Sequence, residues 1–384
     1  MKEKPTYQGF EQGPIRPPSE ASSLLIRITR NCPWNRCTFC PVYKDARFSK
    51  RPIAHVFKDI DTIYHFIAAF KMLPNGDSLQ SHPEVLRTLQ NHQDFDLMGY
   101  NAALNWYHKG MQSIFLQDAD SLMIKPQEML QILTHLKDNF PDVARITSYA
   151  RSRSIVKISD TDLKKIHQAG LNRIHIGLES GHESVLELVK KGVTPEQHIL
   201  AGQKVKKAGM ELSEYIMPGL GGQHLSEAHA IETANVLNQI NPDFIRLRSL
   251  AIPDHIELQK AVVAGTFTPC NDDEIVLEIR TFIEHLEGIE SHIKSDHILN
   301  LFEDLKGKLP EDKLKMLSIL NQYIDFPEPE KMVYRIGRRV GLYRGLQDLE
   351  DPNRRNRIEQ LIREYQVTSE NINEKIALMT SRFI

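Results

Sequence analysis

Short apolar runs alternate with longer amphipathic segments through the first two-thirds of the chain. The runs are rich in β-branched residues and predict strands, whereas the segments repeat apolar residues at helical spacing. We expect strands in 24–29, 113–122, 144–151, 173–179, 211–222 and 243–252, and helices in 53–71, 83–109, 125–139, 159–169, 184–191, 195–208 and 226–238. Right-handed crossovers would place these strands in a parallel sheet. The pattern therefore predicts an α/β fold, a partial (β/α)6 barrel with helices between its strands.

The last third of the chain carries apolar residues at helical spacing throughout, so we expect it to be helical. Proline and glycine positions mark its breaks, at Gly265, Pro310, Pro327 and Pro352. Three segments follow from these patterns. They are an N-terminal extension over 1–21, a core over 22–255 and a helical C-terminal domain over 256–384.

One apolar run of this last third begins after Ser295 and Asp296, which are typical of a helix start. His297 would then lie in the first turn, with Asn300 one turn later. Two interpretations stay open for this group. It is a helix cap with an ordinary first-turn histidine, or it points into the barrel mouth, where His297 could handle a substrate proton.

Three cysteines stand directly after the first predicted strand. Cys32, Cys37 and Cys40 have the spacing C-x4-C-x2-C, and Cys270 is far away in the sequence. Thiolates clustered on one loop suit a soft metal centre, and three ligands to a four-iron cluster would leave one iron open. Cys270 could be a hydrogen-atom donor, an attachment point for substrate, or a small buried apolar residue.

Composition narrows the classes of protein that fit this chain. It has 384 residues, 26% of them charged, a net charge of -2 and no long apolar run, which predicts a soluble globular protein with a sizeable core. The N-terminal segment lacks an apolar signal region, and four cysteines make no disulfide framework in a chain of this size. We therefore expect a cytoplasmic protein with no membrane anchor. The charge argues against a globally basic nucleic-acid binder, although a local patch stays open.

A local excess of basic residues surrounds the cysteines. Between Arg27 and Arg51 there are seven lysines or arginines and one acid, Asp45. This stretch is either a solvated loop or a surface for an anionic electron donor or an anionic substrate.

Polar residues also follow several predicted strands. They are Gln117, Asp118 and Asp120 after the second strand, Arg151 after the third, and Glu179 after the fourth. The carboxyl ends of parallel strands meet at one edge of a sheet, which is where such folds place their chemistry. Consecutive acids at a buried strand end are costly for stability but well placed to receive a ligand's ammonium group.

Four features in this order resemble the radical S-adenosylmethionine (radical SAM) enzymes. They are the cysteine triplet with Phe39 before its third member, the acidic end of the second strand, the sequence IGLESG at the fourth strand and IMPGLGG at the fifth. The resemblance covers residues 22 to about 252. It departs from the family in two ways: the commonest spacing is C-x3-C-x2-C, and the usual pair of glycines is missing from the acidic strand end.

The resemblance implies a [4Fe-4S] cluster held by Cys32, Cys37 and Cys40, with S-adenosylmethionine chelating the open iron and being cleaved to a 5'-deoxyadenosyl radical. It also implies a low-potential electron donor such as a flavodoxin or ferredoxin. Residue by residue, the resemblance assigns roles toward S-adenosylmethionine. Gln117, Asp118 and Asp120 would receive its ammonium group, Arg151 its carboxylate and Glu179 its ribose hydroxyls. Phe39 would lie against the adenine, and the backbone around Ile216 and Leu247 would border it.

Two other classes of protein fit the cysteines. Cys270 could complete a plant-type [2Fe-2S] centre in an electron carrier, or the cysteines could hold a structural zinc ion. Neither alternative explains six βα units with polar strand ends. The substrate stays open among tetrapyrroles, nucleotides or RNA, lipids and peptides. The arginines of the tail are either solvated and paired with acids or a grip for RNA; they are Arg335, Arg338, Arg339, Arg344, Arg354, Arg355, Arg357 and Arg363.

Overall fold

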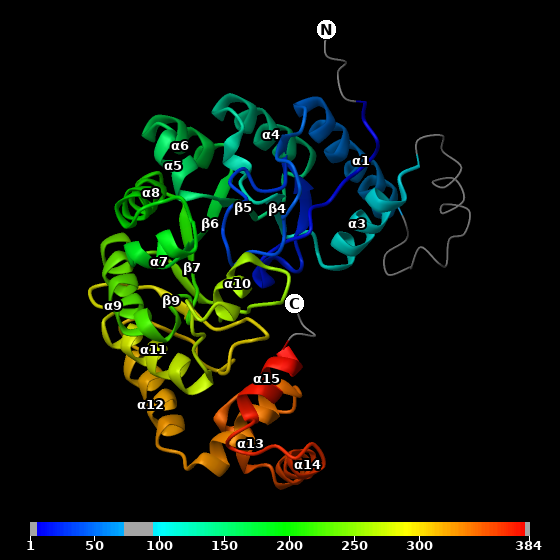
Figure 1. Cartoon of the computed structure of the whole chain (residues 1–384). Coiled ribbons are helices and arrows are strands. Elements are labelled where there is room, and N and C mark those ends of the chain that lie inside the picture. The colour runs from blue at the N-terminus through cyan, green and yellow to red at the C-terminus, as the bar shows by residue number, and fades with distance from the viewer. Residues whose placement is uncertain (1–5, 73–94, 381–384) are drawn as a thin grey trace. The chain divides into compact units, whose positions relative to one another are not determined.

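A computed structural model describes residues 6–72 and 95–380. The chain forms two compact units (Figure 1). Unit 1 comprises Met1–Pro33, Asp45–His175 and Lys204–Glu211. Unit 2 comprises Trp34–Lys44, Ile176–Gln203 and Leu212–Ile384.

Unit 1 contains the first parallel strands. β1 (Leu24–Arg27) pairs with β4 (Ser113–Gln117), which pairs with β5 (Arg145–Ala150), and the first half of β6 (Leu171–Glu179) follows in the strand order. Every residue of β4 is buried, because this strand is covered on both faces. The apolar run of β4 therefore predicts the strand correctly, but the strand ends at Gln117. A short 3-10 helix, η3 (Ser121–Met123), occupies the rest of the expected range.

Five α-helices of unit 1 lie within the described residues. They are α1 (Ile53–Lys71), α3 (Leu97–His108), α4 (Pro126–Asn139), α5 (Ser152–Lys157) and α6 (Asp160–Gln168). α1 packs against α3 and α4. Most of these helices confirm the sequence pattern, whereas α5 was not predicted. The expected helix over 83–109 is observed as α3, and its part before residue 95 lies outside the described residues.

The N-terminal arm and the start of the cysteine loop add short elements to unit 1. η1 (Pro18–Glu20) precedes β1, and β2 (Thr29–Arg30) pairs antiparallel with β3 (Ser49–Lys50). The small β2–β3 sheet therefore brackets the segment that carries the cysteines.

Unit 2 continues the strand order from the second half of β6. β7 (Glu211–Ile216), β8 (Phe244–Leu247) and β9 (His292–Lys294) are parallel neighbours, and β10 (Gly307–Lys308) pairs antiparallel with β9. The strand order has two ends, β1 and β10, so the described strands form an open sheet and no closed barrel. The α/β class and the parallel sheet are thus confirmed.

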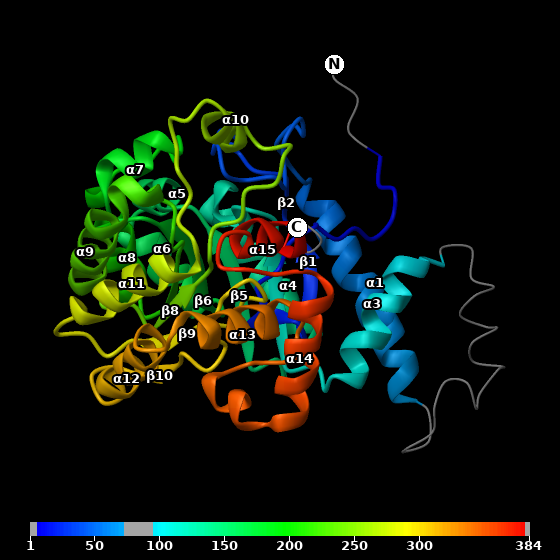
Figure 2. The ribbon, with the colours of Figure 1, turned by 60° about the horizontal axis from the view of Figure 1, so that its bottom comes forward.

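Helices of unit 2 separate its strands and form its C-terminal part. Between the strands lie α7 (Glu183–Leu188), α8 (Pro195–Lys207), α9 (Gly222–Ile240), α10 (Glu257–Val263) and α11 (Asp272–Glu284). After β10 come α12 (Lys313–Ile324), α13 (Glu328–Arg339), η4 (Leu346–Glu350), α14 (Pro352–Glu364) and α15 (Ile372–Thr380). α11 packs against α9 and α12, and α13 against α14 and α15 (Figure 2).

The prediction of a wholly helical last third is wrong at β9 and β10, and no helix starts at Ser295. Residues 295–306 are irregular instead. Asn300 explains this conformation: its side chain accepts from Ser249 N–H at 2.9 Å and donates to Leu247 O and Ser295 Oγ, each at 2.9 Å. A buried amide that bonds three groups in two segments fixes irregular backbone, which helical spacing alone does not reveal.

Among the described helices, none has the length and apolar character needed to cross a lipid bilayer.

Candidate functional site

The part of the cysteine loop that carries Cys37 and Cys40 is anchored within unit 2 by backbone hydrogen bonds. Thr38 N–H donates to Val189 O at 3.0 Å, and Thr38 O accepts from Leu258 N–H at 3.0 Å. Val189 follows α7, and Leu258 lies in the first turn of α10. The loop is therefore fixed to two helices far apart in the sequence.

Trp34 provides a second anchor for the same loop. Its indole N–H donates to Lys190 O at 2.6 Å, and the guanidinium of Arg36 lies over its ring at 5.1 Å. Gly192 packs beneath this ring, and a Cβ at that position would lie 2.2 Å from Cζ2 of the indole. Gly192 also has a positive φ of 71°, so glycine is required here for both space and conformation.

The three clustered cysteines are divided between the two units. Cys32 belongs to unit 1, Cys37 and Cys40 belong to unit 2, and all three are partly exposed. In the described parts of the chain, no three His, Cys, Asp or Glu side chains are grouped as a metal site. The proposed ligand set therefore stays a prediction, and its support is the chemistry of three accessible sulfur donors.

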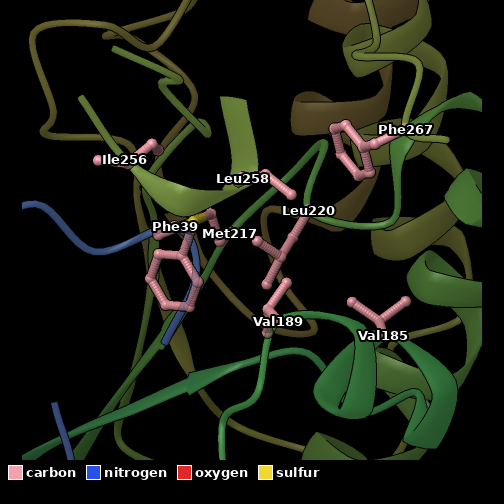
Figure 3. Packing of buried hydrophobic residues seen from close by; sticks show 8 residues of the cluster. All are labelled: Phe39, Val185, Val189, Met217, Leu220, Ile256, Leu258 and Phe267. Atoms are coloured by element: carbon pink, nitrogen blue, oxygen red, sulfur yellow. The ribbon is translucent and has the colours of Figure 1, made fainter. Parts of the chain in front are cut away.

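Phe39 lies in an apolar cluster of unit 2 (Figure 3). Cys37 and Cys40 pack against this cluster from the same loop. Burial of Phe39 therefore seats the segment that carries both cysteines. The other buried members are Val185, Val189, Met217, Leu220, Ile256, Leu258 and Phe267.

Glu179 and Lys191 form an ion pair beside this cluster. Lys191 Nζ lies 3.0 Å from Glu179 Oε1 and 5.9 Å from the centre of the Phe39 ring. Glu179 has a positive φ of 67°, which is rare for a residue with a side chain. Such strained residues cluster at functional sites. The structure therefore brings two of the predicted site residues, Phe39 and Glu179, to one lysine.

A second carboxyl group, that of Glu214 on β7, is fully buried near this pair. Neither of its oxygens has a hydrogen-bond partner among the described residues. Burial raises its pKa well above the ordinary value, the charge of Glu179 adds to this rise, and Lys191 opposes it. Glu214 thus favours its protonated form more than an exposed glutamate does.

In unit 1, the N-terminal arm binds the side chain of Gln117, and Arg27 of β1 binds that of Asp118. The Gln117 amide accepts from Gly13 N–H at 2.8 Å and donates to Ile15 O at 2.6 Å. Asp118 is fully buried and accepts from Arg27 Nη2 at 2.7 Å. Both side chains that the sequence assigns to a ligand's ammonium group therefore have structural partners in the protein.

Asp120 differs from its two neighbours. It is fully buried, and its Oδ2 accepts from Ser154 Oγ at 2.6 Å, while its Oδ1 has no hydrogen-bond partner among the described residues. Burial raises the pKa of Asp120 to about 7, although Ser154 and Arg151 lower it. Arg151 follows β5 and caps α5, so unit 1 brings Asp120 and Arg151 into electrostatic contact.

Two predicted backbone contacts are used within unit 2. Ile216 O accepts from Arg248 N–H at 3.0 Å, and Leu247 O accepts from the Asn300 amide at 2.9 Å. The Ile216 side chain is buried with His229 and Phe282 around a small cavity. The assignment of both residues to an adenine border stays a prediction.

Cys270 and His297 are held in their neutral forms. Burial, with the charge of Glu278, raises the pKa of the Cys270 thiol to about 12. Burial and the charge of Arg248 lower the pKa of His297 to about 4, although Asp296 opposes this shift. At neutral pH, Cys270 is therefore a thiol and His297 an uncharged imidazole.

Several arginines of the tail bind acidic side chains or backbone carbonyls within unit 2. Arg335 and Arg339 both bind Asp272, at 3.1 and 2.6 Å, and Arg338 donates to Tyr343 O at 2.6 Å. Arg355 binds Glu330 at 2.6 Å. These contacts agree with the interpretation of arginines paired within the protein. The other four are exposed: Arg354, which binds Asp348 at 2.7 Å, and Arg344, Arg357 and Arg363.

Residues 100–234 match the family model described as "Radical SAM superfamily". This segment of the chain is therefore similar to the radical SAM superfamily. The matched segment contains Gln117, Asp118, Asp120, Arg151, Glu179 and Ile216, whereas the three clustered cysteines precede it and Leu247 follows it.

Curated relatives and solved structures resemble parts of this chain. It is 19% identical over 271 residues to a tRNA uridine(34) acetyltransferase of Methanocaldococcus infernus, covering 68% of this chain and 49% of the relative. It is 23% identical over 243 residues to a mitochondrial tRNA methylthiotransferase of Homo sapiens, covering 59% of this chain and 37% of the relative. The chain thus spans half or less of the length of these relatives. Coproporphyrinogen III oxidase from Escherichia coli has a TM-score of 0.44 at 14% identity, covering 69% of this chain and 52% of that one.

Several residues of these sites were not predicted from the sequence. Arg27 was noted only as part of a basic stretch, and Gly13 only as part of an extended arm. Glu214 lies in a segment predicted correctly as a strand, Lys191 at the end of a predicted helix, and Ser154 in α5, which was not predicted; no motif marked any of them. The available signals were weak: a lysine after a short helix, and an acid in the middle of a strand.

Proposed function

We propose that the protein is an enzyme that binds a [4Fe-4S] cluster through Cys32, Cys37 and Cys40 and cleaves S-adenosylmethionine reductively. The observation that carries this proposal is the cysteine triplet placed after β1 and ahead of a radical SAM family match over 100–234. When bound, the cluster would supply the electron that converts S-adenosylmethionine into methionine and a 5'-deoxyadenosyl radical.

Asp120 is the residue of unit 1 that best suits the ammonium group of S-adenosylmethionine. Its buried Oδ1 lacks a partner in the described chain, whereas Gln117 and Asp118 are already bound. A cation at this oxygen would lower the pKa of Asp120 from its raised value, because a nearby positive charge favours the carboxylate. Arg151, next to Asp120, would hold the ligand carboxylate.

In unit 2, Glu179 would accept hydrogen bonds from the ribose hydroxyls. Lys191 holds one of its two oxygens and so orients the carboxylate group. Phe39 would border the adenine. Its packing in the apolar cluster fixes the loop that carries Cys37 and Cys40. These assignments follow from positions in each unit taken separately.

The proposal is tested on protein reconstituted with iron and sulfide without oxygen and reduced with dithionite. We expect a [4Fe-4S]+ electron paramagnetic resonance signal that changes when S-adenosylmethionine is added, together with release of 5'-deoxyadenosine. Cys40→Ser should lose the cluster and the cleavage, because a serine is a poor ligand for iron in place of a thiolate.

Cys270→Ser is the matched control, because it makes the same change at a partly exposed thiol outside the proposed ligand set. It should keep both cluster and cleavage. A [2Fe-2S] signal lost in Cys270→Ser would support the electron-carrier alternative. Tightly bound zinc without a cluster would support the structural-zinc alternative, and either result would refute the enzyme.

Transfer RNA is the substrate class that we propose to test first, since the names of two relatives describe enzymes that act on tRNA. Filter binding of tRNA at increasing salt is the measurement. Phosphate contacts by exposed arginines such as Arg344, Arg357 and Arg363 would make affinity fall steeply with salt. Absent or salt-independent binding would remove tRNA from consideration and leave S-adenosylmethionine cleavage untouched.

A further inference from the structure

A buried hydrogen-bonded network joins three elements of unit 2. Ser180 Oγ lies 2.8 Å from His229 Nδ1, and His229 Nε2 lies 3.1 Å from Met217 O and 3.6 Å from Glu278 Oε1. Ser180, His229 and Glu278 are exposed by 4% or less. They come from the end of β6, from α9 and from α11, respectively.

Glu278 binds the glycine-rich turn that links β7 to α9. Its Oε1 accepts from Gly219 N–H at 2.7 Å, and its Oε2 accepts from Ser226 Oγ. Gly219 has a positive φ of 85°, so the turn needs an outside partner to define the direction of its N–H group. A carboxylate that accepts two hydrogen bonds in a buried site provides a stronger contact than a neutral acceptor.

The same network reaches Glu179, the proposed ribose residue. Met217 N–H donates to Glu179 O at 3.0 Å, and Ser180 directly follows Glu179. His229 therefore contacts the turn through Met217 and the end of β6 through Ser180. The network thus contacts the residue that follows Glu179 and two residues of the turn, Met217 and Gly219.

We infer that Glu278 and His229 are positioning residues that hold Glu179 and the Met217–Gly222 turn in the geometry needed for S-adenosylmethionine. This inference rests on the proposed function. Glu278 lies on α11, and His229 lies on α9. Glu278 acts through the backbone and does not touch the ligand.

The charge state of Glu278 makes the device sensitive to pH. Burial raises the pKa of Glu278, while His229, Ser226 and Gly219 lower it. Among the described residues, the thiol of Cys270 is a further titratable group near Glu278, and it stays neutral below a pKa of about 12. As pH falls through the raised pKa of Glu278, protonation removes one acceptor and should loosen the turn.

Hydrogen exchange of the ligand-free protein tests the inference without S-adenosylmethionine. Glu278→Met removes both acceptors but fills the site, and we expect Gly219 N–H to exchange about ten- to a hundredfold faster, as the loss of a charged hydrogen bond predicts. Glu278→Gln keeps one neutral acceptor for Gly219, as the protonated glutamate does, so its protection factor should lie between those of Glu278→Met and wild type. The protection factor of Glu278→Gln should not change with pH, whereas that of the wild type should fall towards it at acidic pH.

Glu284→Met is the matched control. It makes the same change on the same helix at a partly exposed glutamate that pairs with Arg280, so exchange at Gly219 should not change. Equal exchange in wild type and Glu278→Met would overturn the inference, and so would loss of protection spread evenly over unit 2. If Glu278→Met does not fold, the test is the pH dependence of the Gly219 protection factor in Glu278→Gln compared with wild type.

Kinetics provide the second readout. In Glu278→Met the KM for S-adenosylmethionine should rise about tenfold while kcat for 5'-deoxyadenosine release changes little, because lost positioning weakens binding. Unchanged KM with altered exchange would overturn the link to the ligand. Absence of cleavage in the wild type would instead refute the proposed function and leave the exchange result standing.

Discussion

Asp120 offers a direct test of the electrostatics in unit 1. Its carboxyl group is fully buried, and one oxygen has no hydrogen-bond partner among the described residues. Burial raises its folded-state pKa from 3.8 to about 7. An acid with a raised pKa binds its proton more tightly in the folded state, so folding should be favoured at low pH and penalised as pH rises.

The size of this penalty follows from the shift. Each pKa unit corresponds to about 1.4 kcal/mol, so a shift of roughly three units gives about 4 kcal/mol in total above the folded-state pKa. Between about pH 5 and pH 7 the unfolded aspartate is ionised while the folded one is still largely protonated, and roughly 2 kcal/mol of the penalty develops there. The Asp120→Asn variant cannot ionise and should not show this part of the pH dependence.

Urea unfolding of the cluster-free protein at several pH values is the assay. The stability of Asp120→Asn relative to wild type should increase by roughly 2 kcal/mol from about pH 5 to pH 7. Asp138→Asn, the same change at an exposed aspartate of α4, should follow the wild type at every pH. Parallel curves for Asp120→Asn and wild type would refute the argument that burial controls the pKa of this carboxyl group.

Two further predictions concern packing and ion pairs. Arg27→Ala should cost about 3–5 kcal/mol in urea unfolding, because it leaves the buried carboxylate of Asp118 without its guanidinium. Arg30→Ala, which breaks a partly exposed pair, should cost less than about 1 kcal/mol, and equal costs would contradict the reasoning. Gly192→Ala should lower stability by at least about 1 kcal/mol more than Gly265→Ala and shift tryptophan fluorescence, since both have a φ of 71° and only Gly192 would place a Cβ against an indole ring. Equal losses of stability in Gly192→Ala and Gly265→Ala would show that the contact between the new Cβ and the indole ring is relieved without cost.

The order of strands and helices was readable from the sequence because local pattern controls it. β4 is buried on both faces and appears as a continuous apolar run, and α1 has its predicted bounds of Ile53–Lys71. β9 escaped prediction because a strand of three residues carries too little pattern to be distinguished from the helical spacing around it.

The roles of the polar strand ends needed tertiary contacts. Gln117 and Asp118 looked like ligand-binding residues because they follow a buried strand. Their partners, Gly13 and Arg27, lie 104 and 91 residues away in the sequence, and no local rule predicts such a pairing. Asp120 shares the same sequence neighbourhood but keeps an unpartnered oxygen in the described chain.

The sequence by itself determined the α/β alternation, the cysteine spacing and the motifs that resemble radical SAM enzymes, because these depend on residues close together in the chain. Tertiary structure alone decided which carboxylates are neutralised and which stay available, and it brought Glu278 to a turn 59 residues earlier in the sequence. The physical reason is that burial and hydrogen-bond partners, which control the charge of an acid, come from segments that meet only when the chain is folded.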